Sequence, residues 1–91
     1  MPAYLIACHD VTDPAAFQSW RATVLPIIER HGGKAVVRSN KVEVLDGGTN
    51  VTDVVVLEFR DKAALDAATA ELRKHSDTRR KDAKTVLLIA E

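Results

Sequence analysis

Disulfides and long apolar segments are both missing from this chain of 91 residues. It contains one cysteine, Cys8, which cannot form an internal disulfide, and this fits a protein of the reducing cytoplasm. The apolar run at the N-terminus covers only residues 4–8, and no basic leader precedes it. A run this short excludes a signal peptide and a membrane span, so we expect a cytoplasmic protein without membrane contact.

Net charge is missing as well, because 13 basic and 13 acidic side chains cancel. The chain therefore has no overall field that would attract nucleic acid. A local basic cluster does occur near the C-terminus, and it consists of Lys74, Arg79, Arg80, Lys81 and Lys84. Acidic residues interrupt it and no aromatic residue lies between its members to stack on bases, so a solvated helix end or loop is favoured over a nucleic-acid site.

Metal ligands at suitable spacings are also lacking. The candidates are Cys8 and the three histidines His9, His31 and His75, and only Cys8 and His9 lie close together, as direct neighbours. Zinc sites usually draw on pairs separated by two to four residues. We therefore expect no metal site, no haem ligand and no cofactor.

What remains is typical of one small globular domain that spans residues 1–91. Hydrophobic residues make up 46% of the chain and charged residues 29%. Alternating and continuous apolar stretches predict strands at residues 2–8, 34–38, 53–59 and 85–90, with residues 42–45 continuing or restarting the second strand. In the first of these, Tyr4, Ile6 and Cys8 share one face, and Leu5, Ala7 and His9 share the other.

Two helices are predicted between these strands. The first begins at Asp13-Pro14, a capping residue followed by the proline that suits the first helical position. Its apolar stripe runs from Phe17 to His31, and Pro26 within it predicts a kink or break. Gly32-Gly33 ends it, with one glycine in the left-handed conformation. Asp61 caps the second helix, whose stripe is Ala64, Leu65, Ala68 and Leu72.

The predicted order is strand, helix, strand, strand, helix, strand. This order favours the ferredoxin-like α+β fold, a four-stranded antiparallel sheet with both helices on one face and the first and third strands in the centre. Both faces of the strands carry valine, leucine and isoleucine. Because the helices cover only one face, we expect a second copy of the chain to cover the other and form a homodimer.

Four stretches resemble a known family: MPAYLIA at residues 1–7, VTDPAAF at 11–17, HGGKAVVRSNKVEVLDGG at 31–48 and VVVLEF at 54–59. They are similar to the bacterial family known as domain of unknown function 1330, within the dimeric α/β-barrel superfamily. The resemblance implies a ferredoxin-like fold and dimerisation. It implies no reaction, although the superfamily includes cofactor-free oxygenases, isomerases, decarboxylases and haem-binding proteins.

The chain departs from the family pattern in two places. Asp53 stands where the family usually has an arginine that opens the third strand. Residues 67–82 contain no aromatic residue, whereas the family usually has an aromatic turn rich in serine and proline before the last strand. If that turn lines the family's pocket, the pocket of this chain is altered or absent.

Arg38 is the first candidate site residue, selected both by the family pattern and by its place at a strand end. It could hold a carboxylate with two hydrogen bonds, or it could form a salt bridge with Glu58 or Glu43. His9 and Glu58 are the catalytic candidates, each as a general base. The alternatives are a half-exposed His9 with local hydrogen bonds and a Glu58 that pairs with Arg38.

Three further residues are ligand-binding candidates. Trp20 and Tyr4 could stack on a flat ligand in a pocket between helix and sheet, or they could belong to the core. Asn40 could hydrogen-bond a ligand or mark a bend in the chain.

Together these residues predict a cytoplasmic homodimer that binds a small organic acid or aromatic ligand in a cleft between helices and sheet. One interpretation is a metal-free enzyme of the monooxygenase or isomerase type. The alternative is a non-catalytic dimer that binds a ligand or serves as an accessory protein. The sequence does not decide between them.

Overall fold

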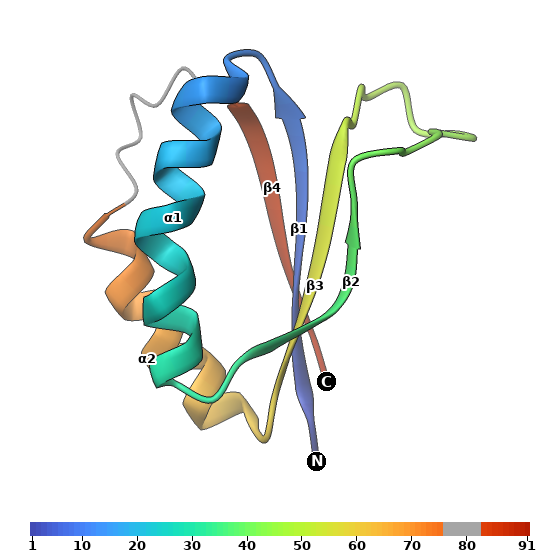
Figure 1. Cartoon of the computed structure of the whole chain (residues 1–91). Helices are drawn as coiled ribbons and strands as arrows, with labels where there is room; N and C mark the ends of the chain where they lie inside the picture. The colour runs from blue at the N-terminus through green and yellow to red at the C-terminus, as the bar shows by residue number, and fades with distance from the viewer. Residues whose placement is uncertain (76–82) are drawn as a thin grey trace.

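The computed structural model describes residues 1–75 and 83–91. Its elements follow the predicted order: β1 (Ala3–Val11), α1 (Pro14–Arg30), β2 (Lys34–Ser39), β3 (Asp53–Phe59), α2 (Lys62–Arg73) and β4 (Ala83–Ala90). The strands form one antiparallel sheet in the order β2-β3-β1-β4, and both helices lie on one face of it (Figure 1). The predicted ferredoxin-like fold is confirmed, with β1 and β3 in the centre of the sheet.

The first helix begins after Asp13 and ends before Gly32-Gly33, as predicted. The Asp13 carboxylate accepts a hydrogen bond from the Ala16 amide at 3.2 Å, and Pro14 is the first helical residue. Of the predicted kink or break at Pro26, the break is wrong, because α1 continues to Arg30, and the kink stays a prediction. Ala22 and Pro26 both lie on the exposed side of α1, where water can reach the carbonyl that Pro26 leaves without a partner.

The turn after α1 uses its two glycines differently. Gly32 has φ +80°, the predicted left-handed conformation, and its amide donates to the Glu29 carbonyl. Gly33 has no positive φ, but a side chain there would meet the core. A Cβ at Gly33 would lie 2.6 Å from Ile28 Cγ2 and 2.7 Å from the Phe59 ring. Gly33 therefore lets the chain pass close to the core on its way into β2.

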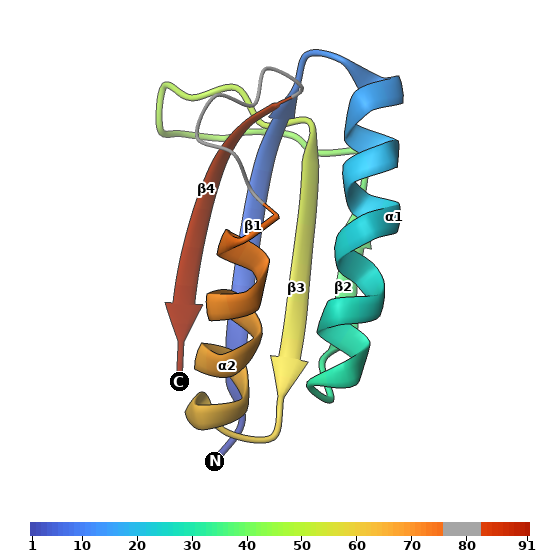
Figure 2. The ribbon, with the colours of Figure 1, turned by 90° about the vertical axis from the view of Figure 1, so that its left-hand side faces the viewer.

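The hydrophobic core lies between the helices and the sheet. Figure 2 shows the helices in front of the sheet. Its buried residues come from β1, β3 and both helices, and they are Ala3, Leu5, Ile28, Leu57, Phe59, Leu65 and Ala68. The Asp61 carboxylate caps α2 by accepting from the Ala64 amide at 2.8 Å. The predicted stripe of α2 is thus the face that packs on the sheet.

An irregularity in β2 decides which way Arg38 faces. Lys34 and Ala35 pair with Glu58 and Leu57, but the register then shifts, and Val37 pairs with Val56. Without this bulge, strict alternation from Ala35 would place Arg38 on the face away from the helices. With the bulge, Arg38 pairs with Val55, whose neighbour on β1 is Ala7, on the helix-covered face.

Residues 40–52, which we call the arm, connect β2 to β3. The prediction of a strand at residues 42–45 is wrong, because the pairing of β2 with β3 ends at Ser39 and Val54. The arm leaves the sheet on the side opposite the helices, and both views show it crossing one end of the sheet (Figures 1 and 2). Asn50 Nδ2 donates to Asp10 Oδ1 at 3.0 Å, and the Thr52 amide donates to the His9 carbonyl at 2.8 Å.

The sheet face away from the helices, which we call the open face, is apolar. Residues that point to this side include Tyr4, Ile6, Cys8, Val37, Val54, Val56, Val86, Leu88 and Ala90. Within the single chain Val37, Val86 and Leu88 are each about half exposed. No helix of the described part of the chain is long and apolar enough to cross a membrane.

Candidate functional site

Two adjoining cavities lie where α1 meets the sheet. The outer one, the mouth, has a volume of about 390 Å³ and is lined by Phe17, Gln18, Arg21, Arg38, Ser39, Asn40, Lys41, Asp53 and Val55. The inner cavity has a volume of about 80 Å³, and its walls are mostly apolar side chains of α1, β1 and β3, with His9 and Trp20 among them. Phe17, Arg21, Arg38 and Val55 line both cavities. The arrangement is a polar entrance in front of a small apolar space.

Arg38 lies at the junction of the two cavities. Among residues 1–75 and 83–91 its side chain forms no ion pair and no hydrogen bond. The expected salt bridge with Glu58 is not formed, because Lys34 occupies the register position opposite Glu58 and its Nζ lies 3.6 Å from Glu58 Oε1. The Arg38 guanidinium therefore keeps its donors available on the side where the mouth lies.

Two more cations and one carboxylate share the mouth with Arg38. Arg21 Nη2 donates to Gln18 Oε1 at 2.7 Å, and Lys41 lies at the start of the arm. Asp53, the residue that departs from the family pattern, accepts from Thr52 Oγ1 at 2.7 Å. Asn40 lines the mouth as well, as its predicted role requires. Three cations against one carboxylate make the mouth suited to an anion.

His9 lies deeper than predicted. We expected it where β1 leaves the sheet, but β1 continues to Val11, and His9 pairs with Asp53 and Thr85 at 3% exposure. Its Nδ1 is 2.9 Å from Thr85 Oγ1, which fixes the orientation of the imidazole. The ring lies edge-on to Phe17 at 4.8 Å. His9 is thus a buried, oriented imidazole in the wall of the inner cavity.

Trp20 is a second aromatic neighbour of His9. The two ring centroids are 5.9 Å apart, and the Trp20 ring lies 5.8 Å from that of Phe17. Phe17, Trp20 and Val24 follow one another at spacings of three and four along α1, so the helix presents them together to the sheet. The prediction that Trp20 forms a wall between helix and sheet agrees with this position, and its ligand role stays a prediction.

Tyr4 and Glu58 do not reach the cleft. They are register partners on β1 and β3, and both point to the open face. A hydrogen bond to Glu58 is the main cause that raises the pKa of the Tyr4 hydroxyl. The predicted convergence of Arg38 with His9 on one cavity occurs, whereas Glu58 lies on the other side of the sheet.

Sequence reasoning missed Arg21, Gln18 and Lys41. The position of Arg21 could have been predicted. It lies four residues after Phe17 and therefore borders the buried stripe of α1. Lys41 carried none, because its position depends on the course of the arm. No group of three or more histidine, cysteine or acidic side chains that could hold a metal occurs in residues 1–75 and 83–91. Residues 76–82, which include Arg79, Arg80 and Lys81 of the basic cluster and the end of the segment 67–82, lie outside the described part of the chain.

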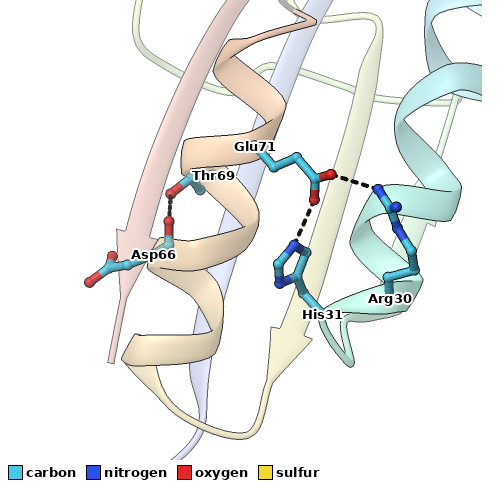
Figure 3. Close-up of polar contacts among 5 residues, drawn as sticks. All are labelled: Arg30, His31, Asp66, Thr69 and Glu71. Atoms are coloured by element: carbon cyan, nitrogen blue, oxygen red, sulfur yellow. Dashed lines mark hydrogen bonds and ion pairs between the residues drawn. The ribbon is translucent and has the colours of Figure 1, made fainter.

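A charged cluster joins the two helices at the end away from the mouth (Figure 3). Glu71 of α2 accepts from Arg30 Nη2 at 2.7 Å with one oxygen and from His31 Nε2 at 2.7 Å with the other. The hydrogen bond with His31 is the main cause that lowers the pKa of Glu71, and the charge of Arg30 adds to it. Leu72 of α2 and Ile28 of α1 both line the inner cavity. The cluster therefore fixes the helices that form the cavity walls.

Replacing Glu71 with glutamine should lower the melting temperature at neutral pH. A carboxylate whose pKa is lower in the folded chain than its ordinary value of about 4.3 stabilises the fold above that pH, and loses the effect as the pH falls through the folded pKa. The difference in melting temperature between wild type and Glu71→Gln should therefore be largest near pH 7 and shrink below about pH 4. Thermal unfolding across this range measures it, with Glu29→Gln as the control, since Glu29 forms no ion pair among the described residues. A difference that persists unchanged in acid would contradict this account.

Solved structures with the same fold span a wide range of sequences. A protein of unknown function from Rhodopseudomonas palustris, RPA0582, is 19% identical with a TM-score of 0.71, over 98% of this chain and 80% of that one. SnoaB, a cofactor-independent oxygenase from Streptomyces nogalater, is 17% identical with a TM-score of 0.68, over 99% and 91%. The de novo designed protein Foldit4 is 9% identical with a TM-score of 0.70, over 100% and 98%. A designed protein matches as well as a natural oxygenase does, so these similarities establish the fold alone.

Sequence comparison is more specific. Among curated proteins none matches this chain. The family model described as "Domain of unknown function (DUF1330)" matches residues 2–91, which is nearly the whole chain. Apart from Met1, the four stretches that carried the resemblance lie within the match, as do Arg38 and the double glycine before β2. This chain therefore belongs to the DUF1330 family.

Proposed function

We propose that this protein is a cytoplasmic homodimer whose cleft binds a small organic acid with a flat apolar body. The observation that carries the proposal is the Arg38 side chain, which lines both cavities and has no ion pair within residues 1–75 and 83–91. Arginine presents two parallel N–H donors that match the two oxygens of a carboxylate. Arg21 and Lys41 add positive charge to the same mouth.

Cavity size supports a division of the ligand between the two spaces. Ligand pockets usually measure roughly 300–1,000 Å³, and the mouth, at about 390 Å³, lies in this range. The inner cavity, at about 80 Å³, holds only a few atoms. The acid group and most of the ligand body would occupy the mouth, while a small apolar substituent would enter the inner cavity toward His9 and Trp20.

The catalytic form of the proposal gives His9 the role of general base. Its imidazole would take a proton from a ligand carbon beside a carbonyl group, with Thr85 holding the ring in place. Return of the proton at another carbon makes an isomerase. In a monooxygenase the carbanion would add dioxygen, and the resulting peroxide would take up the proton to give a hydroperoxide. Loss of water from the hydroperoxide leaves a carbonyl group, so one oxygen atom enters the ligand and the other departs as water. The likeness to the cofactor-independent oxygenase SnoaB agrees with this type of chemistry.

The alternative form is a ligand-binding or accessory protein without chemistry. It is favoured by the small inner cavity, which brings few ligand atoms near His9. Mass spectrometry after incubation in air separates the two forms once a ligand is known. A changed ligand mass or a rearranged product supports the enzyme, and an unchanged ligand supports the binding protein.

Ligand binding itself is tested by thermal unfolding with matched pairs of compounds. Benzoate and phenylacetate should raise the melting temperature, whereas benzamide and phenylacetamide, which have the same shape without the charge, should not. A ligand at one hundred times its dissociation constant stabilises the fold by about 2.7 kcal/mol, which is several degrees in a domain of this size. Equal effects of acids and amides would contradict the role of the cationic mouth.

The homodimer in the proposal rests on the open face. Its apolar residues on β1, β3 and β4 are partly exposed in the single chain, and a second sheet packed against them would remove this area from water. A chain of this length has a thin core, so the additional burial would also stabilise the fold.

A further inference from the structure

A row of side chains crosses the helix-covered face of the sheet from the mouth into the inner cavity. Arg38 on β2 is the register partner of Val55 on β3. Val55 in turn pairs with Ala7 on β1, and Ala7 pairs with Leu87 on β4. All four residues line the inner cavity. The row therefore begins at a cation and continues over apolar side chains only.

Ala7 is the gap in this row. The residues before and after it on the same face of β1 are Leu5 and His9, whose side chains are much larger. Ala7 is only 7% exposed, so the space that its short side chain leaves lies inside the molecule, as part of the inner cavity. Unfilled apolar space lowers the stability of a fold, and a valine at this position would fill it. The alanine therefore keeps room for something else.

The walls around this space are apolar. Trp20 and Val24 of α1 line it from the helix side, and Leu72 of α2 lines it as well. A water molecule takes up about 30 Å³ in the liquid and a methyl group is of similar size, so a cavity of about 80 Å³ holds about two or three such groups. The space therefore suits a small alkyl group.

The distance along the row fits an aromatic acid. Neighbouring strands lie about 4.8 Å apart, so the backbones at Arg38 and Ala7, which are two strands apart, are separated by about 10 Å. A carboxylate bound by the Arg38 guanidinium and a benzene ring over Val55 occupy this length, with Phe17 lining both cavities beside the ring. A group on the ring opposite the carboxylate then lies over Ala7, whereas a group next to the carboxylate stays in the mouth.

We propose that the ligand is an aromatic acid with a small alkyl group opposite its carboxylate, that it lies along this row, and that Ala7 sets the size of the alkyl group. The simplest members of this class are the 4-alkylbenzoates. The inference rests on the ligand site of the proposed function, and it adds the direction of the ligand, its substituent and a residue that determines specificity.

Isothermal titration of the wild type with three acids tests the direction of the ligand. The acids are benzoate, 4-ethylbenzoate and 2-ethylbenzoate. Each carbon buried in an apolar space tightens binding about three- to fourfold, so 4-ethylbenzoate should bind about tenfold more tightly than benzoate. Its isomer 2-ethylbenzoate carries the same number of carbons and should bind no more tightly than benzoate does.

The variant Ala7→Val tests the role of the alanine. Its two added carbons should fill the space, so the preference for 4-ethylbenzoate over benzoate should fall from about tenfold to nearly none. The melting temperature without ligand should not fall, because the valine enters unfilled space. Ala35→Val is the matched control and should keep the wild-type preference. Ala35 lies on β2, pairs with the buried Leu57 and lines neither cavity.

The variant Val24→Ala tests the same space from the opposite wall, and it decides the matter if valine at position 7 prevents folding. Val24 is 2% exposed, and the change removes two carbons from the inner cavity. The affinity of 4-tert-butylbenzoate, which carries two carbons more than 4-ethylbenzoate, should then rise several-fold relative to that of 4-ethylbenzoate. An unchanged ratio would overturn the proposal.

The remaining outcomes separate this inference from the proposed function. If benzoate binds but 4-ethylbenzoate binds no more tightly, or if Ala7→Val keeps the wild-type preference, the ligand does not lie along the row, and the acid site at Arg38 stands without it. Tighter binding of 2-ethylbenzoate than of 4-ethylbenzoate would also overturn the direction. If none of the acids binds, the proposed function fails together with the inference.

Discussion

Replacing Arg38 with alanine should weaken the binding of a carboxylate ligand by about 10- to 100-fold and leave the melting temperature of the free protein nearly unchanged. A hydrogen bond to a charged group contributes about 1.5–3 kcal/mol, and each 1.4 kcal/mol corresponds to a tenfold change in affinity. The fold loses little, because Arg38 is exposed and forms no ion pair among the described residues. Isothermal titration with benzoate measures the first effect, and thermal unfolding without ligand measures the second.

Two variants serve as controls for Arg38→Ala. Arg38→Lys keeps the charge but loses the paired donors. Its affinity for benzoate should therefore lie between those of the wild type and Arg38→Ala. Arg60→Ala removes an exposed arginine on the segment between β3 and α2, and should bind as wild type does. If Arg38→Ala instead binds normally and unfolds at a much lower temperature, Arg38 is a structural residue and the mouth has no ligand role.

Lysine in place of Leu88 should separate the proposed homodimer, whereas lysine in place of Ile89 should not. The two residues are neighbours on β4 with similar exposure, 51% and 48%, but they point to opposite faces. Leu88 pairs with Ile6 on the open face, and Ile89 pairs with the buried Leu5 on the helix side. An unpaired charge buried between two sheets costs several kcal/mol, which should raise the dissociation constant at least about 100-fold.

Light scattering over a range of concentrations measures this difference. Circular dichroism of both variants controls for unfolding, since each lysine should leave the secondary structure of the chain intact. If both variants stay dimeric, the open face is not the interface. If only Ile89→Lys becomes monomeric, the interface includes the side of β4 that lies on the same face of the sheet as the helices.

The sequence predicted the fold because its signals were local and agreed with one another. Asp13-Pro14, Gly32-Gly33 and Asp61 marked the ends of the helices, and β3 was predicted at the residues where it occurs. Apolar residues on both faces of the first and third strands identified the centre of the sheet. Each of these signals depends on a few consecutive residues, so no knowledge of distant contacts was needed.

The site depended on features that local patterns do not contain. The alternation of side chains along β1 placed Tyr4 and His9 on opposite faces of the sheet. It could not show which face the helices cover. Both residues were therefore assigned to the same cleft. The side that Arg38 faces depends on the bulge between Ala35 and Val37, which arises from the pairing with β3. The predicted strand at residues 42–45 had the right residues for a strand but no partner, since the pairing ends at Ser39.

The measurement that tests the account most directly is a titration of isotope-labelled protein with benzoate, followed by two-dimensional NMR of the backbone amides. The account predicts that the shifted signals belong to the mouth, with Phe17, Arg21, Arg38 and Asp53 among the largest. It also predicts that these shifts disappear in Arg38→Ala. Shifts confined to the Arg30–Glu71 end of the helices or to the open face, or none at high concentration, would contradict a ligand site in this cleft.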